Sequence, residues 1–163
     1  MNSKLALLDR DGTLIENAHY LSDPAGVRLL PGTVEGLLEL RRLGYRLVMV
    51  SNQSGVGRGY FGEAEVRAVN ARLQELLAPH GAELDLLLYC PHSPEAGCAC
   101  RKPGPAMAEE ACRLLDASLE GAIVVGDSDC DMDLARALQV PGYRVGTPEL
   151  AGLDGLARLL QQG

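Results

Sequence analysis

Two aspartates separated by one residue, Asp9 and Asp11, follow a short apolar run near the start of the chain. The run, residues 5–8, has the pattern of a buried strand, and ionised carboxylates avoid burial unless they are paired or bound to metal. In an extended chain, residues two apart point the same way, so both carboxylates can face one site. Gly12 then allows a turn that a residue with a Cβ would resist. The pattern suits Mg²⁺, which binds one or two carboxylates, waters and a substrate phosphate. The alternative is a solvated Asp-Gly turn.

Polar residues that can hold a phosphoryl group follow two later segments of the chain. The apolar run 46–50 ends in Ser51 and Asn52, where a hydroxyl and backbone N–H groups can bind phosphate oxygens. An ordinary polar turn is the alternative. Lys102 precedes Pro103, which biases it away from helical geometry and leaves its ammonium group on a loop. That ammonium can neutralise charge on a phosphoryl group, or it can be a solvated surface lysine.

A further segment carries four aspartates within seven residues, directly after the apolar run 122–125. Carboxylates this close repel one another unless some are solvated, protonated or bound to metal. Asp127 comes first after the run, which makes it the best placed third acidic metal ligand. Asp131 can hold the loop or reach the ion through water. Asp129 and Asp133 are expected to be solvated, or to lie near a helix N-terminus where negative charge is favoured.

Cysteine and histidine are grouped just ahead of Lys102. Cys90 and His92 form a C-x-H pair, and Cys98 and Cys100 form a C-x-C pair. Four soft ligands at this spacing match a closed structural Zn²⁺ site, and the one-residue gaps place each pair on one side of an extended chain. A loop of free thiols is the alternative. A zinc ion there would fix the two residues that directly follow the last cysteine.

Alternating apolar and amphipathic segments predict an α/β fold that can position these groups. The apolar runs carry little polar interruption, as do parallel strands covered on both faces. Helical periodicity marks the segments between them, with Thr33 as an expected cap and Pro105 as an expected first-turn residue. The alternation predicts a single doubly wound, mainly parallel sheet with helices on both faces. Ligands bind beyond the carboxyl ends of such strands. The expected strands are Lys4–Leu8, Arg46–Val50, Leu84–Tyr89, Ala122–Val125 and Tyr143–Val145, and the expected helices are Thr33–Leu43, Glu63–Leu77, Pro105–Leu115, Asp131–Leu138 and Leu150–Gln161.

Composition narrows the class of protein. The 163 residues predict one domain, 1–163, and the 47% hydrophobic content predicts a globular chain. The net charge of −7 argues against nucleic acid or an anionic membrane as the main partner, because both need a basic face. No export signal is visible, and no apolar segment approaches the ~18 residues of a membrane span. We therefore expect a soluble, cytoplasmic monomer that acts on a small molecule. We also expect a short zinc-binding loop at about residues 90–102 and no large cap domain.

Taken in order, these motifs resemble the four signatures of the haloacid dehalogenase superfamily of phosphatases, and together they span nearly the whole chain. The resemblance implies that Asp9 attacks phosphorus to form an aspartyl-phosphate, and that Asp11 protonates the leaving alcohol and then activates water. It also implies that Asp9, the Asp11 backbone carbonyl and Asp127 hold Mg²⁺, and that Ser51 and Lys102 bind phosphoryl oxygens. The matching motifs are Asp9-Arg10-Asp11-Gly12-Thr13, Ser51-Asn52, Lys102-Pro103 and Gly126-Asp127 with Asp131.

The zinc loop ahead of Lys102 resembles two groups within the superfamily, the D-glycero-D-manno-heptose 1,7-bisphosphate phosphatases and the histidinol-phosphate phosphatases. Residues 17–20, 52–59 and 101–105 look more like the heptose enzymes, which implies hydrolysis of the C7 phosphate in surface-polysaccharide precursor synthesis. Histidinol phosphate remains the alternative substrate, because the five-residue gap between His92 and Cys98 also occurs in that group. The substrate-binding residues implied by the resemblance are Asn17, Tyr20, Ser51, Asn52, Gln53, Ser54, Arg58, Arg101 and Lys102.

A phospho-accepting signalling module is the alternative from a different class. Receiver domains also combine a doubly wound fold with clustered acids, a hydroxyl residue and a lysine. Asp11, placed to act as acid and base, favours the phosphatase, and the zinc loop adds weight to that interpretation.

Overall fold

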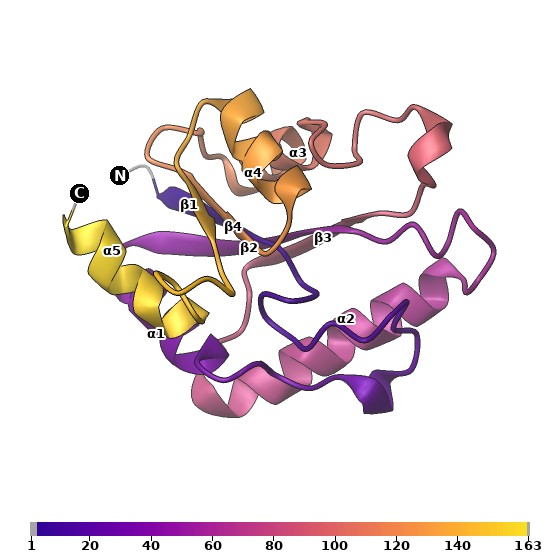
Figure 1. Cartoon of the computed structure of the whole chain (residues 1–163), viewed down its shortest axis with the longest axis horizontal. Helices are drawn as coiled ribbons and strands as arrows, with labels where there is room; N and C mark the ends of the chain where they lie inside the picture. The colour runs from indigo at the N-terminus through magenta and orange to yellow at the C-terminus, as the bar shows by residue number, and fades with distance from the viewer. Residues whose placement is uncertain (1–2, 163) are drawn as a thin grey trace.

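Residues 3–162 are described by a computed structural model, whose centre is one sheet of five parallel strands with helices on both faces (Figure 1). The strands lie in the spatial order β3-β2-β1-β4-β5. The predicted doubly wound parallel sheet is therefore confirmed. The strands are β1 (Lys4–Leu8), β2 (Tyr45–Asn52), β3 (Leu86–Cys90), β4 (Ile123–Gly126) and β5 (Gly142–Arg144). The helices are α1 (Thr33–Arg42), α2 (Glu63–Leu77), α3 (Ala106–Leu115), α4 (Asp129–Leu138) and α5 (Leu156–Gln162).

Two cores lie on opposite faces of the sheet because successive strand side chains alternate in direction. On β1, Ala6 and Leu8 pack into the core formed with α1, α2 and α5, whereas Leu5 and Leu7 pack into the core formed with α3 and α4. Figure 1 shows these two groups of helices on opposite sides of the strands. All four side chains are fully buried, and each buried leucine contributes about 1.5–3 kcal/mol to stability. This packing fixes the position of the residue that follows β1.

Element boundaries lie close to the predicted ones, and β1 and α2 match at both ends, but α5 was expected to begin at Leu150 and begins at Leu156. The cap of α1 was predicted wrongly: Gly32 is the N-cap residue, and the Thr33 hydroxyl instead donates to the carbonyl of Leu14 at 2.8 Å. Pro105 is likewise the N-cap of α3 and not its first residue. Helix α4 begins two residues earlier than predicted, and a short 3₁₀ helix, Leu153–Gly155, precedes α5.

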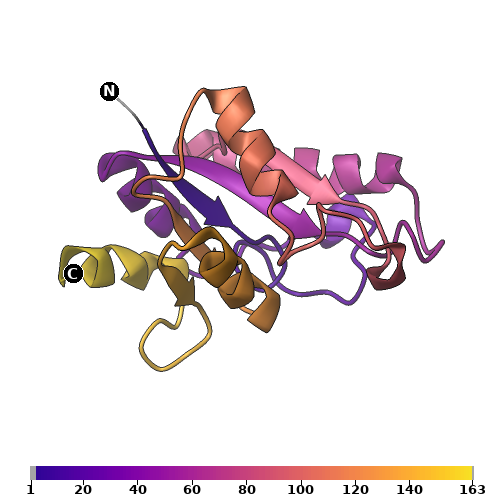
Figure 2. The ribbon, with the colours of Figure 1, turned by 90° about the horizontal axis from the view of Figure 1, so that it is seen from above.

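The order of the strands reverses between β1 and β4, since β2 and β3 continue on one side and β5 on the other. Ligands bind at such a point, beyond the carboxyl ends of the strands. The backbone N–H of Asp9 donates to the carbonyl of Val125 at 2.9 Å, which joins the ends of β1 and β4. In Figure 2 the arrows of β1, β2 and β3 point to the same end, where the loops that follow them gather.

Within residues 3–162, no segment forms a separate cap domain over this edge of the sheet. None of the helices in that range combines the length and the apolar character needed to cross a membrane.

Candidate active site and metal centre

A cavity of about 330 Å³ opens at the carboxyl edge of the sheet, at the point where the strand order reverses. The loop after β1 contributes both Asp9 and Asp11, so the two carboxylates face one site as their spacing predicted. The structure thus brings together most of the predicted site residues, from four separate parts of the chain. Those that line the cavity are Asp9, Asp11, Asn17, Tyr20, Asn52, Gln53, Ser54, Arg101, Lys102 and Asp127.

Three carboxylates meet at the floor of this cavity, two from the lining residues Asp9 and Asp127 and one from Asp131, which is buried behind them. One oxygen from each of Asp9, Asp127 and Asp131 lies within 4.8 Å of the other two. The Lys102 ammonium group is buried beside them, with Nζ 3.0 Å from Asp9 Oδ1 and 2.6 Å from Asp131 Oδ1. Lys102 is therefore no solvated surface lysine. One ammonium cannot balance three carboxylates, so the floor keeps an excess of negative charge that favours a bound cation.

The pKa values of Asp9 and Lys102 reflect the same excess of negative charge. Burial raises the pKa of Asp9 to about 8, and the Asp131 and Asp127 carboxylates add to the shift while Lys102 opposes it. Burial by itself favours loss of the Lys102 proton, but Asp9 and Asp131 outweigh it and raise the pKa of the ammonium group. A divalent cation between Asp9 and Asp127 would add the positive charge that keeps Asp9 ionised. The oxygen donors and the charge deficit fit Mg²⁺.

Two glycines make room for these carboxylates. A Cβ on Gly12 would lie 2.0 Å from Asp127 Oδ2, and a Cβ on Gly126 would lie 2.1 Å from Asp131 Oδ2. Gly12 also has a φ of +82°, a backbone conformation that strongly favours glycine. The turn expected at Gly12 therefore serves to bring β1 and Asp127 into close contact.

Gly12→Ala is expected to raise the Mg²⁺ concentration needed for half-maximal activity by about tenfold or more, because the new methyl group displaces a metal-binding carboxylate. The measurement is initial rate against Mg²⁺ concentration. Gly146→Ala is the matched control, since Gly146 has the same φ of +82° and no atom of the described residues lies within 4 Å of a Cβ placed on it. Both variants carry a backbone cost of about 1–3 kcal/mol. An unchanged Mg²⁺ requirement in Gly12→Ala would contradict the close contact with Asp127.

The carboxylate of Asp11 stands apart from the cluster of three. It accepts hydrogen bonds from Gln53 Nε2 at 3.0 Å and from the Arg10 guanidinium at 3.2–3.3 Å. Its side chain is 23% exposed, so one face stays open to the cavity. The third carboxylate of the cluster with Asp9 and Asp127 therefore comes from Asp131 and not from Asp11. The sequence patterns assign no role to Arg10, although a charged residue inside an otherwise buried motif was a signal that it needs a partner.

The polar residues at the end of β2 form hydrogen bonds with other residues of the site. Asn52 Oδ1 accepts from the backbone N–H of Lys102 at 2.9 Å, and Asn52 Nδ2 donates to the Lys102 carbonyl at 3.3 Å. This pair of bonds clamps the lysine loop onto β2. Gln53 Nε2 also donates to the Ser51 hydroxyl at 2.6 Å. Ser51 is fully buried and does not line the cavity, so its predicted contact with phosphate stays a prediction.

The aspartates of the segment 127–133 differ in burial and in the residues that they contact. Asp131 is 1% exposed and accepts from the backbone N–H and the hydroxyl of Ser128 at 3.3 and 2.8 Å. It thereby caps α4 and holds the loop, which is one of its two expected roles. Asp129 is 88% exposed at the first residue of α4 and pairs with Arg144. Asp133 is also exposed to solvent, as expected.

The rim of the cavity carries the remaining predicted substrate residues. Asn17 and Tyr20 line it, and Tyr20 has a φ of +52° and packs edge-to-face on Tyr60 at 4.8 Å between ring centroids. Arg101 also lines the cavity, and its buried Nη1 has no hydrogen-bond partner among residues 3–162. Arg58 is not a lining residue; it is exposed, with Nε 3.4 Å from the Ser54 hydroxyl.

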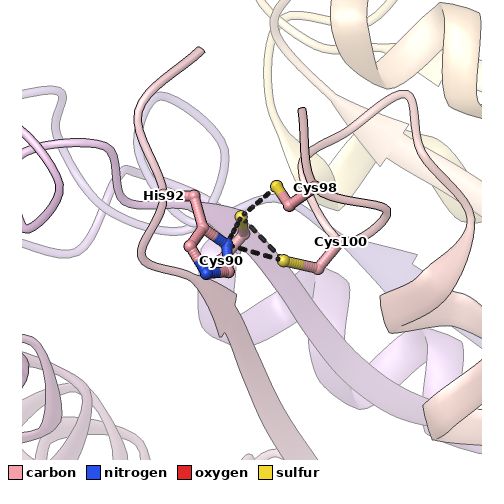
Figure 3. Close-up of side chains that lie close together, drawn as sticks. All are labelled: Cys90, His92, Cys98 and Cys100. Atoms are coloured by element: carbon pink, nitrogen blue, oxygen red, sulfur yellow. Dashed lines mark hydrogen bonds between the residues drawn. The ribbon is translucent and has the colours of Figure 1, made fainter. Parts of the chain in front are cut away.

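The predicted zinc ligands converge at the end of β3, beside the active site (Figure 3). Cys90 Sγ lies 3.0 Å from Cys100 Sγ, 3.5 Å from Cys98 Sγ and 3.4 Å from His92 Nδ1. A tetrahedron with Zn–S bonds of about 2.3 Å and Zn–N bonds of about 2.0 Å has edges of roughly 3.5–3.8 Å. Figure 3 shows the four side chains pointing toward a common centre. The soft donor set fits a closed Zn²⁺ site, and the donor atoms lie slightly closer together than these edges.

The ionisation of the cysteine thiols in this cluster would depend on a bound Zn²⁺. Burial raises the pKa of the Cys90 thiol to about 12, and the Cys100 thiol adds to the shift. At Cys98 burial by itself would raise the pKa, but the backbone N–H groups of Arg101 and Cys100 and the neighbouring thiols together outweigh it and lower the pKa to about 6. A bound Zn²⁺ converts coordinating thiols to thiolates. The cluster directly precedes Arg101 and Lys102, which line the cavity. A fixed conformation of this loop therefore helps to fix the positions of these two side chains.

Comparison with known proteins agrees with this geometry. The family model described as haloacid dehalogenase-like hydrolase matches residues 18–139. The chain belongs to this family. It is 36% identical to the D-glycero-β-D-manno-heptose-1,7-bisphosphate 7-phosphatase of Pseudomonas aeruginosa, over 100% of this chain and 91% of that protein. Its counterpart in Rhodopseudomonas palustris is 36% identical over 85% of this chain and 81% of that protein.

A solved structure extends the similarity to three dimensions. The D,D-heptose 1,7-bisphosphate phosphatase of Bordetella bronchiseptica, crystallised with magnesium and phosphate, superposes with a TM-score of 0.87 at 32% identity and covers 98% of this chain and 99% of that one. The prediction of a haloacid dehalogenase-type phosphatase is thus confirmed.

Proposed function

We propose that this haloacid dehalogenase-like enzyme uses Mg²⁺ to remove the C7 phosphate of D-glycero-D-manno-heptose 1,7-bisphosphate through an aspartyl-phosphate on Asp9. The observation that carries the proposal is the cluster of Asp9, Asp127 and Asp131 around Lys102, with Asp11 held separately at the open side of the same cavity. Similarity to heptose bisphosphate phosphatases along the whole chain supports the choice of substrate.

In the first step, Asp9 is the nucleophile. Lys102 fixes one of its carboxylate oxygens, which leaves the other to attack phosphorus. As the bond from phosphorus to the C7 oxygen breaks, Asp11 gives its proton to that oxygen, and the heptose leaves as an alcohol. When bound, Mg²⁺ supplies charge that reduces the repulsion between carboxylate and phosphate and stabilises the phosphoryl oxygens.

In the second step, Asp11 acts as the base. It takes a proton from a water molecule, whose oxygen attacks the phosphorus of the aspartyl-phosphate. The bond between Asp9 and phosphorus breaks, inorganic phosphate leaves, and the Asp9 carboxylate is restored. Each step has a lower barrier than direct hydrolysis, which for phosphate monoesters is among the slowest uncatalysed reactions.

Arg101 favours a substrate with a second anionic group. Its buried Nη1 has no hydrogen-bond partner within the described part of the chain, and a buried polar group left unpaired costs about 1–3 kcal/mol. A phosphate at the far end of a sugar bisphosphate can satisfy it. Asn17, Tyr20 and Ser54 line the same rim and are proposed to contact the sugar, while the assignments of Asn52, Gln53, Ser51 and Arg58 to substrate binding stay predictions.

A comparison of two substrates tests the proposal. We expect kcat/KM for heptose 1,7-bisphosphate to exceed that for histidinol phosphate by about tenfold or more, because histidinol carries an amine where the bisphosphate carries an anion that can pair with Arg101. Arg101→Leu is expected to remove most of this preference. A clear preference for histidinol phosphate, which the short zinc loop favours, would overturn the substrate and leave the mechanism intact.

We also propose that residues 1–163 form a single phosphatase domain that acts as a monomer, with Zn²⁺ in a structural role at the cysteine–histidine cluster.

A further inference from the structure

Arg10, between the two aspartates of the first motif, is almost fully buried, at 1% exposed. A buried guanidinium is costly unless it is paired and its donors are satisfied. The Nε and Nη2 edge of Arg10 faces the Asp11 carboxylate, with N···O distances of 3.2–3.3 Å. Nη1 donates to Asn70 Oδ1 at 3.0 Å. Asn70 lies on α2, is 8% exposed and does not line the active-site cavity.

We infer that Asn70 and Arg10 are positioning residues that hold the Asp11 carboxylate for its acid and base steps. The inference rests on the proposed function, in which Asp11 donates and then accepts a proton. It assigns a part in the reaction to helix α2, which contributes no residue to the cavity wall.

The geometry supports a positioning role because the guanidinium is held at both ends. Its planar fork is rigid, so fixing Nη1 at Asn70 also fixes the edge that faces Asp11. Gln53 holds the Asp11 carboxylate from another direction at 3.0 Å. The side chain of Asp11 nevertheless stays 23% exposed, which leaves it accessible to the leaving oxygen and to water.

The neutral side chain at position 70 is part of this arrangement. An amide oxygen accepts one hydrogen bond from Arg10 without balancing its charge. Among residues 3–162, Asp11 is the one carboxylate that forms an ion pair with Arg10. The guanidinium therefore interacts with Asp11 as its counter-ion. Misplacing an acid–base group by about 1 Å can cost about 10²-fold in rate.

The test uses Asn70→Leu, which removes the acceptor while keeping the side chain similar in size. With a sugar phosphate as substrate, kcat is expected to fall about 10- to 100-fold with little change in KM, since the proton transfers are slowed and binding is not. With p-nitrophenyl phosphate the leaving group needs no protonation. The first step then stays fast, while attack of water still needs Asp11. A stopped-flow trace should therefore show a burst of one equivalent of nitrophenol per active site, followed by slow turnover.

Two further variants separate positioning from stability. Asn70→Gln keeps a neutral amide acceptor for Arg10 and is expected to hold kcat within about threefold of the unmodified enzyme. Gln74 lies one turn further along α2, and Gln74→Leu removes its two hydrogen bonds to the backbone of Leu84, at 2.8 and 3.0 Å. These bonds involve neither Arg10 nor Asp11. Gln74→Leu is expected to lower the unfolding temperature without producing a burst.

The inference is overturned if Asn70→Leu turns over both substrates at the unmodified rate per folded molecule. It is equally overturned if burst and steady-state rates fall together in proportion to lost folded protein, because that is the behaviour of a purely structural residue. Failure of the proposed function looks different: Asp9→Asn would then remain active, whatever Asn70→Leu does.

Discussion

Asp9→Asn is expected to abolish turnover, by a factor on the order of 10⁴ or more, while the protein stays folded. The amide cannot form the aspartyl-phosphate, and it also weakens Mg²⁺ binding by removing one carboxylate. The fold survives because Lys102 keeps its 2.6 Å contact with Asp131, and because replacing one of three crowded carboxylates by a neutral group relieves repulsion. The measurements are release of inorganic phosphate and thermal unfolding.

Asp133→Asn is the matched control for this result. Asp133 lies in the same aspartate-rich segment but is 50% exposed and pairs with Arg136 on the surface of α4. We expect its activity to be close to that of the unmodified enzyme, since surface ion pairs contribute about 0–1 kcal/mol. If Asp9→Asn kept even a tenth of the original rate, another group would have to be the nucleophile.

The second large effect is expected at the metal centre: Cys100→Ser should lose its zinc and most of its activity. A structural zinc ion contributes on the order of 10 kcal/mol to the ordering of a small metal-dependent unit. Here the ordered unit leads directly into Arg101 and Lys102. Displacing Lys102 by about 1 Å from Asp9 would cost about 10²-fold in rate. Metal analysis of the purified protein, together with phosphatase assays, tests both expectations.

Cys112→Ser is the control, because this half-buried cysteine of α3 is outside the cluster of four. It should keep one zinc per chain and retain its activity. A Cys100→Ser protein with unchanged zinc content would refute the proposed ligand set. A zinc-free protein with full activity would instead show that the loop is ordered without metal.

The fold was predictable because its signals are local. The apolar run of β1 and the apolar stripe of α2 each reflect burial of one segment against a sheet or its covering helices, and both matched end to end. Misassigned termini reflect long-range contacts that no local pattern contains. Thr33 looks like a helix cap, yet its hydroxyl bonds Leu14, nineteen residues away, and leaves the cap to Gly32.

The functional groups were predictable for a related reason. Carboxylates, a lysine and paired cysteines next to apolar runs are unfavourable in a core unless chemistry or metal requires them. Their types and positions therefore marked the site before its geometry was known. The roles of side chains that act on other side chains were not predictable in this way. That Asn52 clamps the Lys102 backbone was not foreseen, and its predicted contact with substrate stays a prediction. Nothing near Asn70 in the sequence points to Arg10.

By itself, then, the sequence determined the class of fold, the phosphatase family and the two clusters of side chains that could hold a metal ion, because each depends on residue type and short spacing. Only the tertiary structure decided which carboxylate completes the cluster around Lys102, which polar residues reach the cavity, and how α2 connects to Asp11. Those outcomes depend on distances between residues far apart in the sequence, such as Asp9 and Lys102, which are separated by 93 positions. The packing of the whole sheet sets these distances, and no single segment contains them.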